Sequence, residues 1–385
     1  MKICLCITRL KSDLSEAISK NFFRLAEELT NQGHDVTMYS PVSIDVPSKT
    51  KLVVYSKEHS YQSKFSVLKN IKELSKRINK DHSDFDAVHI HAGFLLEAYL
   101  LGRKINKFNT PLYITLWQPY LGFKEFSKIP HLIFLKPKDY LYHFVLNSFL
   151  GVHFMGNKVK NKYNKIIVSS NYQKEQLTKI LPEKIIKTIP NGLIDSEIKK
   201  ESFNEQPNII YIGHFTSYKG TDALIKSLYF IKREYPETKL TLAYSGYGSK
   251  PEIIKLIKKL KLQNNVILKN KIGVYSELAK NDFLIIPYKA TIGTSHYHNV
   301  LLEAMSVGVP IFASKIGSIP ELINNEETGI FINPKKPHLI AKKVINTFAN
   351  KELIEKLSEN EKRLFQEKFI IKRVAQQHLN IYGEQ

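Results

Sequence analysis

The sequence of 385 residues contains few cysteines, methionines and tryptophans: two, four and one, respectively. Cys4 and Cys6 alternate on one predicted strand, a spacing badly suited to a structural disulfide and typical of small buried side chains in a reducing compartment. The longest nearly uncharged run is too short to span a bilayer, and the N-terminus shows no small-residue cleavage site. We therefore expect a cytoplasmic globular protein of more than one domain.

Acidic residues are also scarce, since 57 lysines and arginines face 36 aspartates and glutamates, a net charge of +21. Such an excess favours an anionic partner: nucleic acid, an anionic membrane surface or a phosphorylated small molecule. A solvated lysine-rich surface without such a partner is the alternative explanation for much of this charge. Because the sequence has no tandem basic helices and no basic motif interleaved with stacking aromatics, we expect no nucleic-acid partner.

Strand and helix patterns alternate along the chain, which predicts an α/β fold with mostly parallel, doubly wound sheets. In the first half the predicted strands cover residues 3–7, 35–39, 87–90, 112–116 and 166–169. After the polar stretch 201–206 the predicted strands cover residues 209–212, 240–244, 266–268, 283–286, 310–313 and 329–332. This pattern predicts a first domain at 1–190, a hinge at about 190–207 and a second domain at 207–365.

Five segments follow the motifs of one enzyme family in order and spacing. They are NQGHDVTMYS, FDAVHIHAG, KIIVSSNYQKEQL followed by IPNG, IIYIGHFTSYKGTDALIKSL, and VLLEAMSVGVPIFASKIGSIPELI. Over nearly its full length the chain resembles glycosyltransferase family 4, the retaining enzymes of the GT-B fold. The resemblance implies two Rossmann-like domains facing across a cleft, with an acceptor site in the first and a nucleotide-sugar donor site in the second. It also implies that a C-terminal helix, at about 366–385, crosses back to the first domain.

The loop KATIGTSHYHN follows the predicted strand 283–286 and leads into a helix that begins near His298 or Asn299. Ligands of open α/β sheets bind beyond the carboxyl ends of the strands, and the free N–H groups of a helix N-terminus favour a diphosphate. The resemblance implies that Glu303 accepts the ribose hydroxyls, whereas the alternative makes it a solvated helix residue. The predicted donor contacts of this stretch are Gly293, Thr294, Asn299, Val300 and Glu303.

The sequence departs from the family's E-x7-E motif, because Ser295 stands at the position of the first glutamate. A serine hydrogen-bonds a sugar hydroxyl but supplies no negative charge to a developing oxocarbenium-like centre. His296 and His298 are the candidates that would compensate, with plain loop residues as the alternative. Together with His91, these three residues form the predicted catalytic set.

A second constellation, GHFTSYKG, runs from Gly213 to Gly220 between a predicted strand and a helix. Glycines let the backbone approach phosphates, and Lys219 supplies a positive point charge to them. The family usually has arginine where His214 stands, and histidine is a weaker, pH-dependent substitute. Ile272 is a further predicted donor contact, at a place where the resemblance implies backbone recognition of the base.

In the first domain, His89 and His91 alternate on one predicted strand and so face the same side. His91 is a candidate contact of the acceptor or donor sugar, with a satisfied structural histidine as the alternative. Trp117 stands where the family has a further histidine; its aromatic face can pack on a sugar ring but cannot take a proton. Ser15 and Trp117 are the predicted acceptor-side residues.

The resemblance implies a retaining, metal-independent hexosyltransferase without a bound cofactor. It would move a hexose or N-acetylhexosamine from a UDP- or GDP-sugar to a hydroxyl of a glycan or lipid-linked acceptor, in the synthesis of cell-surface polysaccharide, glycolipid or glycoprotein glycans. The alternative is a catalytically degenerate GT-B protein that binds glycans or partners an active transferase, which the departures at Ser295, His214 and Trp117 would fit.

The lysine-rich stretch 121–165 leaves two interpretations open. Its mixture of lysines with aromatic and aliphatic residues is typical of a segment that lies on an anionic membrane, here the inner face near a lipid-linked acceptor. An ordinary insertion of the acceptor domain with a solvated lysine rim would have the same composition. A peripheral membrane location is therefore one of two expectations.

Overall fold

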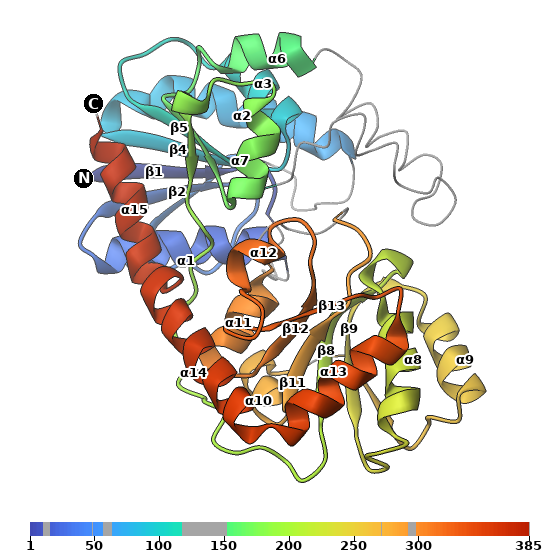
Figure 1. The fold of residues 1–385 in the computed structure, drawn as a ribbon. Helices are drawn as coiled ribbons and strands as arrows, with labels where there is room; N and C mark the ends of the chain where they lie inside the picture. The colour runs from blue at the N-terminus through green and yellow to red at the C-terminus, as the bar shows by residue number, and fades with distance from the viewer. Residues whose placement is uncertain are drawn as a thin grey trace. The chain divides into compact units, whose positions relative to one another are not determined.

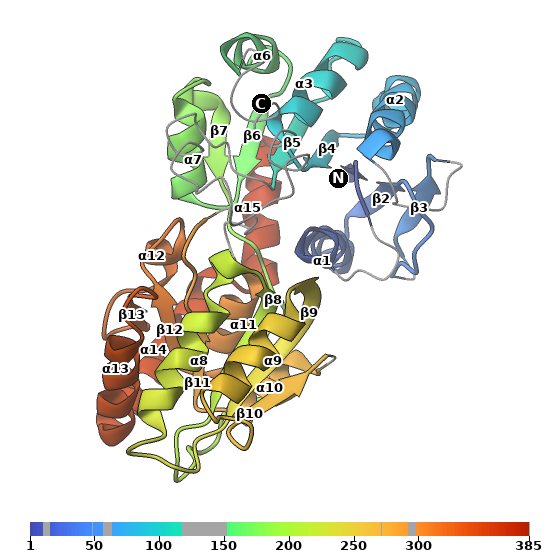
Figure 2. The same cartoon turned by 90° about the vertical axis from the view of Figure 1, so that its right-hand side faces the viewer.

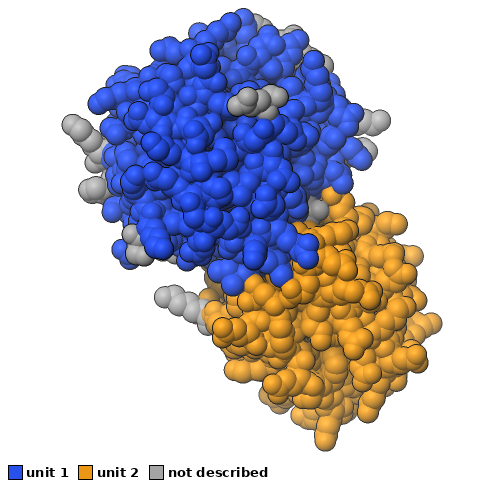
Figure 3. Space-filling view, turned by 90° about the vertical axis from the view of Figure 1, so that its left-hand side faces the viewer, with its two compact units in different colours: residues 1–129, 136–194, 370–385 blue, residues 130–135, 195–369 orange. Residues whose placement is uncertain are grey.

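The computed structural model describes residues 1–10, 16–47, 49–56, 64–117, 152–270, 272–291 and 298–384. Among these, the residues before Asp195 and after Phe369 form one compact unit, and those from Asp195 to Phe369 form a second (Figure 3). No helix in the described ranges combines the length and apolarity that crossing a bilayer requires.

The first unit is built on a seven-stranded parallel sheet with the strand order β3-β2-β1-β4-β5-β6-β7 (Figures 1 and 2). The strands are β1 (Lys2–Ile7), β2 (Asp35–Ser40), β3 (Lys51–Val54), β4 (Ala87–Ala92), β5 (Leu112–Leu116), β6 (Lys165–Val168) and β7 (Ile186–Thr188). The α-helices are α1 (Ala17–Asn31), α2 (Lys64–Asp81), α3 (Leu95–Lys104), α6 (Val152–Val159), α7 (Asn171–Thr178) and α15 (Ile371–Gly383).

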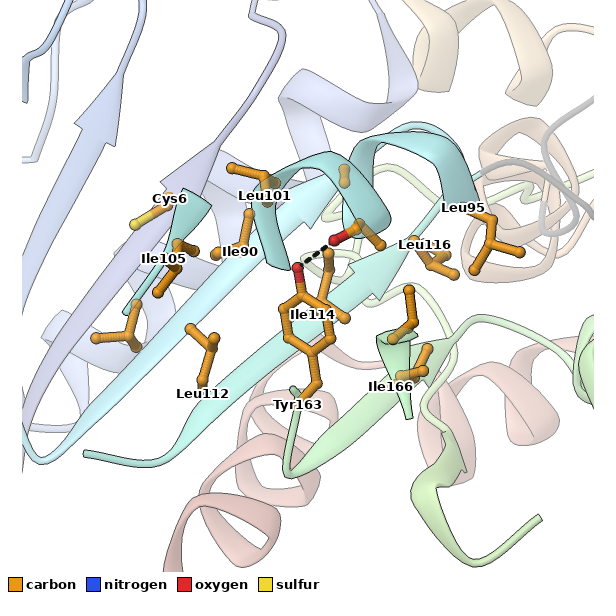
Figure 4. Packing of buried hydrophobic residues seen from close by; sticks show 14 of the residues in the cluster. Cys6, Ile90, Leu95, Leu101, Ile105, Leu112, Ile114, Leu116, Tyr163 and Ile166 are labelled. Carbon is orange, nitrogen blue, oxygen red and sulfur yellow. Dashed lines mark hydrogen bonds between the residues drawn. The ribbon is translucent and has the colours of Figure 1, made fainter. Parts of the chain in front are cut away.

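Alternate side chains of β1 enter two different cores, as the period of two in a strand requires. Cys4 and Cys6 are buried with the apolar residues of α2, α3 and α6, whereas Leu5 packs with those of α1 and α15. Figure 4 shows the first of these cores, where Tyr163 also donates a hydrogen bond of 2.7 Å to the carbonyl of Ala98. The sheet is therefore covered by helices on both faces, as expected for a parallel sheet.

The chain returns to the first unit at α15, which packs against α1 (Figure 1). Leu193 and Ile370 form an isolated parallel bridge, and the Tyr113 hydroxyl on β5 donates to the carbonyl of Ile381. Gly192 lies against the start of α15 so closely that a Cβ there would be 2.9 Å from the Cα of Ile371. The glycine of the IPNG motif thus permits the close packing of the segment before Asp195 on this helix.

The second unit contains a six-stranded parallel sheet with the order β10-β9-β8-β11-β12-β13. Its strands are β8 (Ile209–Phe215), β9 (Leu240–Gly248), β10 (Val266–Lys269), β11 (Phe283–Ile286), β12 (Ile311–Ser314) and β13 (Ile330–Ile332). Its α-helices are α8 (Thr221–Ile231), α9 (Lys250–Lys259), α10 (Val274–Ala279), α11 (Asn299–Val307), α12 (Ile319–Leu322), α13 (Pro337–Ala349) and α14 (Lys351–Lys368). Helix α8 packs against α9 and α13, and α11 packs against α10 and α14 (Figure 2).

The polar stretch that we expected to belong to the hinge is anchored to the second unit. The Lys200 ammonium pairs with the Asp282 carboxylate at 3.1 Å, and both side chains are buried. Asn204 donates to the same carboxylate through its backbone and its side chain. A buried pair of this kind fixes position more than it adds stability. The two units divide between Ile194 and Asp195, so residues 195–207 of the predicted hinge belong to the second unit.

The predicted α/β fold class with two parallel-sheet domains is confirmed. Two short strands were missed: β3 is only partly buried, and β7 is three residues long. The return to the first unit comes at Ile370 and not at about residue 366, because α14 continues to Lys368 and buries Phe365 in the second unit.

Candidate functional site

In the second sheet the strand order reverses between β8 and β11, and ligands of open α/β sheets bind at such a switch point. The loops that follow these two strands are in contact, because the backbone N–H of Lys289 donates to the carbonyl of Tyr218 at 2.8 Å. Gly220 has a φ of +71°, and a Cβ there would lie 1.9 Å from the carbonyl oxygen of Pro287. Only glycine fits this approach, which brings the β8 loop against the β11 loop.

Lys219 is a buried cation at this switch point, with 4% of its surface exposed. Its ammonium lies 3.8 Å from the centre of the Tyr288 ring, a cation–π contact. No acidic side chain in the described part of the chain forms an ion pair with it. Burial lowers the pKa of Lys219 to about 7, so a bound anion would stabilise its charged form.

The N-terminus of α11 contacts the same tyrosine. His298 is the N-cap residue of this helix, and its ring meets the Tyr288 ring edge to face at 4.9 Å between centroids. Glu303 lies about one turn into the helix and is buried, while Asn299 and Val300 in the first turn are half-exposed. The N-terminus of α11, the buried Lys219 and the His298 ring therefore gather around Tyr288. The positive end of a helix dipole beside a lysine is an arrangement suited to a phosphate group.

The other predicted donor residues are distributed as follows. Gly213 and His214 lie near the end of β8, where the His214 carbonyl accepts a hydrogen bond of 2.7 Å from the Tyr211 hydroxyl. Ile272 lies between β10 and α10. Gly293, Thr294, Ser295, His296 and Ser15 fall outside the described residues, so their predicted roles stay predictions.

The sequence analysis missed Tyr288, which connects Lys219 with His298. A signal was present, because FLIIPY places an aromatic residue directly after a fully apolar strand at the switch point. Aromatic rings in such loops usually serve core packing as well, so the position alone did not distinguish it.

In the first sheet the order reverses between β1 and β4, and the residues after these strands form a hydrogen-bonded cluster. The buried carboxylate of Glu97 accepts from the Thr8 hydroxyl at 2.7 Å and from the backbone N–H of Gly93 at 3.1 Å, and it pairs with Arg9. The Arg9 guanidinium also lies over the Phe94 ring at 5.3 Å. The sequence analysis missed this cluster, although a glutamate on the apolar helix LLEAYLL was a signal for it.

His91 and Trp117 occupy the ends of β4 and β5 in the first unit. Their rings stack with centroids 5.6 Å apart and an interplanar angle of 29°. Phe22 of α1 meets His91 edge to face at 5.0 Å. Both His91 and Trp117 are buried, so a large part of the tryptophan face is covered by protein.

Two family models match the chain. The model for glycosyl transferases group 1 matches residues 194–364, and the model for glycosyltransferase family 4 matches residues 19–197. An uncharacterised glycosyltransferase from Methanocaldococcus jannaschii is 26% identical over 309 residues, which cover 76% of this chain and 80% of that protein. The matches to two further relatives cover 59% and 55% of their lengths.

Solved structures show the same fold over almost the whole chain. Sucrose-phosphate synthase from Thermosynechococcus elongatus superposes with a TM-score of 0.75 at 17% identity, covering 99% of this chain and 98% of that one. HepE from Anabaena, solved in complex with UDP, gives a TM-score of 0.72 at 14% identity over 100% of both chains. These matches show the GT-B fold, and the two family models show that the chain belongs to glycosyltransferase family 4.

Proposed function

We propose that this protein is a retaining, metal-independent glycosyltransferase that uses a nucleotide-diphosphate sugar. The second unit would bind the donor, and the first would bind a glycan or lipid-linked acceptor through a hydroxyl. The single observation that carries the proposal is Lys219, a buried cation at a switch point with no acidic partner among the described residues. A diphosphate supplies the charge that this site lacks.

The site residues would act mainly by position and charge. Lys219 and the first N–H groups of α11 would hold the diphosphate, and the Glu303 carboxylate would accept hydrogen bonds from the ribose hydroxyls. As the bond from the anomeric carbon to the phosphate oxygen breaks, the acceptor oxygen bonds to that carbon on the same face and its proton passes to the departing diphosphate. The Lys219 ammonium over Tyr288 would stabilise the charge that develops on the leaving group.

HepE from Anabaena, which shares the fold, has been solved with UDP and also with UDP-glucose, and this supports a UDP-sugar as the first donor to test. The hexose or N-acetylhexosamine type of the sugar and a role in polysaccharide, glycolipid or glycoprotein glycan synthesis are parts of the proposal. A location at the inner face of the membrane is also part of the proposal. Its support is the lysine-rich composition of the stretch 121–165, most of which lies outside the described residues.

The second candidate function is that of a degenerate GT-B protein that binds glycans or assists an active transferase. Its support is the replacement of three family residues by Ser295, His214 and Trp117. The ring of Trp117 packs on His91, which leaves little of it to hold a sugar. A degenerate protein, however, has no need of a buried lysine without a counter-ion, since such a group lowers stability unless an anion binds.

The test is thermal unfolding of the wild type with UDP, GDP, ADP, CMP and the corresponding nucleotide sugars. A ligand at a hundred times its dissociation constant stabilises the native state by about 2.7 kcal/mol. We expect one nucleotide to raise the unfolding temperature, and Lys219→Met to weaken its binding about tenfold to a hundredfold through loss of a charged hydrogen bond. Glu303→Ala should weaken binding of the same nucleotide.

Lys289→Met provides the matched control. Lys289 lies in the neighbouring loop and pairs with Asp222 at 2.6 Å, so its charge is already compensated. It should leave nucleotide binding nearly unchanged. If no nucleotide shifts the wild type, or if both lysine variants bind equally well, the donor-site assignment is wrong and the degenerate alternative is favoured.

A further inference from the structure

A small cavity of about 30 Å³ lies in the first unit, at the carboxyl ends of β4, β5 and β6, with both apolar and polar residues in its lining. The segment around Pro190 and the N-terminal half of α15 also line it. His91, Trp117 and His378 line it from β4, the end of β5 and α15, with exposed fractions of 2%, 7% and 6%. A space of this size holds one water molecule or one hydroxyl group and is far too small for a sugar ring.

The lining carries several buried nitrogen atoms without hydrogen bonds to any described residue. They are Nδ1 and Nε2 of His91, Nε1 of Trp117 and Nδ1 of His378. Buried polar atoms are nearly always hydrogen-bonded, and each one left without a partner costs free energy. Four such atoms around one cavity indicate that something other than protein completes it.

The neighbouring His89 shows that a histidine here can be fully satisfied by protein. It lies on the same strand face, its Nδ1 is 2.6 Å from the Tyr382 hydroxyl, and its Nε2 is 2.8 Å from the Thr115 hydroxyl. The His89 and His91 rings are 4.4 Å apart. Of these two neighbouring histidines, only His91, which lines the cavity, has ring nitrogens without hydrogen bonds to described residues.

The donor set defines the chemistry of the missing group. The Trp117 indole can only donate, whereas a neutral imidazole donates through one nitrogen and accepts through the other. Burial lowers the pKa of His91 well below its ordinary value and that of His378 to about 3, so both rings are neutral at physiological pH. An anion would find no positive charge among these three side chains, but a hydroxyl both accepts and donates.

We propose that this cavity is a binding site for one hydroxyl group, which accepts from the Trp117 indole and hydrogen-bonds the His91 and His378 imidazoles. Two sources share this chemistry: an ordered water, or a hydroxyl arm of a carbohydrate substrate. The second source rests on the proposed transferase function, and the first does not.

The chain contains one tryptophan, so the indole N–H gives a single resonance that reports directly on the cavity. In the wild type without ligands, we expect a magnetisation-transfer cross peak between this N–H and a bound water. D-glucose, N-acetyl-D-glucosamine and UDP-glucose are then added in separate titrations. A persistent water cross peak identifies water as the occupant, and its loss with a shift of the indole resonance identifies a sugar hydroxyl.

Trp117→Phe and His91→Phe keep aromatic packing but remove hydrogen-bonding atoms, and Tyr113→Phe is the matched control. The Tyr113 hydroxyl donates to the Ile381 carbonyl at 3.1 Å, so its hydrogen bond is completed within the protein. We expect His91→Phe to abolish the cross peak and Tyr113→Phe to preserve it. Nitrogen shifts of the His378 ring in Trp117→Phe provide a second readout if the other variant folds poorly.

An indole N–H with no water cross peak and no response to any of the three sugars would overturn the proposal. So would a cross peak that survives in His91→Phe with unchanged shifts of the His378 ring. Nucleotide binding in the second unit is measured separately through Lys219→Met. The experiments can therefore contradict the proposal for the cavity without contradicting the proposed donor site, and the reverse.

Discussion

Arg9 at the switch point of the first sheet and Lys219 at that of the second are both basic, but their charges meet opposite surroundings. In the first unit Arg9 pairs with the buried carboxylate of Glu97, so the local charge is compensated within the protein. In the second unit Lys219 meets the face of Tyr288 and, among the described residues, no acidic group. The difference suits a neutral, hydroxyl-rich ligand in the first unit and an anionic ligand in the second.

The largest expected effect comes from removing the compensation in the first unit. Glu97→Ala deletes the acceptor of Thr8 and Gly93 and leaves Arg9 without its partner. Breaking such a pair should lower the free energy of unfolding by about 3 kcal/mol, which urea denaturation would measure. In this variant Arg9 would lack an acidic partner, as Lys219 does among the described residues of the second unit.

Arg9→Met/Glu97→Gln is the control for this prediction. It removes both charges but keeps an oxygen that accepts from Thr8 and Gly93, so it should recover more than half of the lost stability. If the single and double variants are equally unstable, the pairing of charges does not explain the role of Glu97, and the comparison between the two switch points loses its basis.

The next effect concerns the glycine that brings the two loops of the second unit together. Gly220→Ala forces a left-handed residue at φ +71°, which costs about 1–2 kcal/mol, and adds a Cβ that would be 1.9 Å from the Pro287 oxygen. The loops must therefore separate, and we expect both a loss of stability above about 2 kcal/mol and a loss of nucleotide binding. Urea denaturation and calorimetric titration with the nucleotide found to bind would measure these.

Gly246→Ala is the control that separates the cost of a positive φ from the steric clash of a new Cβ. Gly246 has a φ of +102°, but a Cβ there would meet nothing within 4 Å. It should lose only the conformational part, about 1 kcal/mol, and keep nucleotide binding. Equal losses of nucleotide affinity in the two variants would show that contact between the loops is not what forms the site.

The sequence predicted those features of the two switch points that depend on neighbouring residues in the chain. Apolar strands followed by glycine and charged residues located Lys219 and the start of α11 to within about a residue. The parts that failed depend on partners far apart in the chain. Arg9 and Glu97 are 88 positions apart, and the cavity beside His91 is lined also by His378 of the last helix. A local pattern could mark Glu97 as unusual, but it could not show which partner each of these groups has.

The last predicted effect is a gradual pH dependence of nucleotide binding in the second unit. The pKa of Lys219 is about 7 in the free protein, and a bound diphosphate would raise it. Between pH 7 and 9 the complex would then hold a proton that the free protein loses, so nucleotide affinity should fall by up to about tenfold per pH unit, or 1.4 kcal/mol. Calorimetric titrations at several pH values in this window would measure the slope.

The same group should act on stability with the opposite sign. Its pKa in the native state lies below the ordinary 10.5, so between pH 7 and 10.5 the unfolded chain binds more protons and the contribution of Lys219 to stability rises with pH. Both slopes should vanish in Lys219→Met and persist in Lys289→Met, whose charge is compensated by Asp222. An affinity slope that survives in Lys219→Met would assign the proton to another group and remove the main difference between the two switch points.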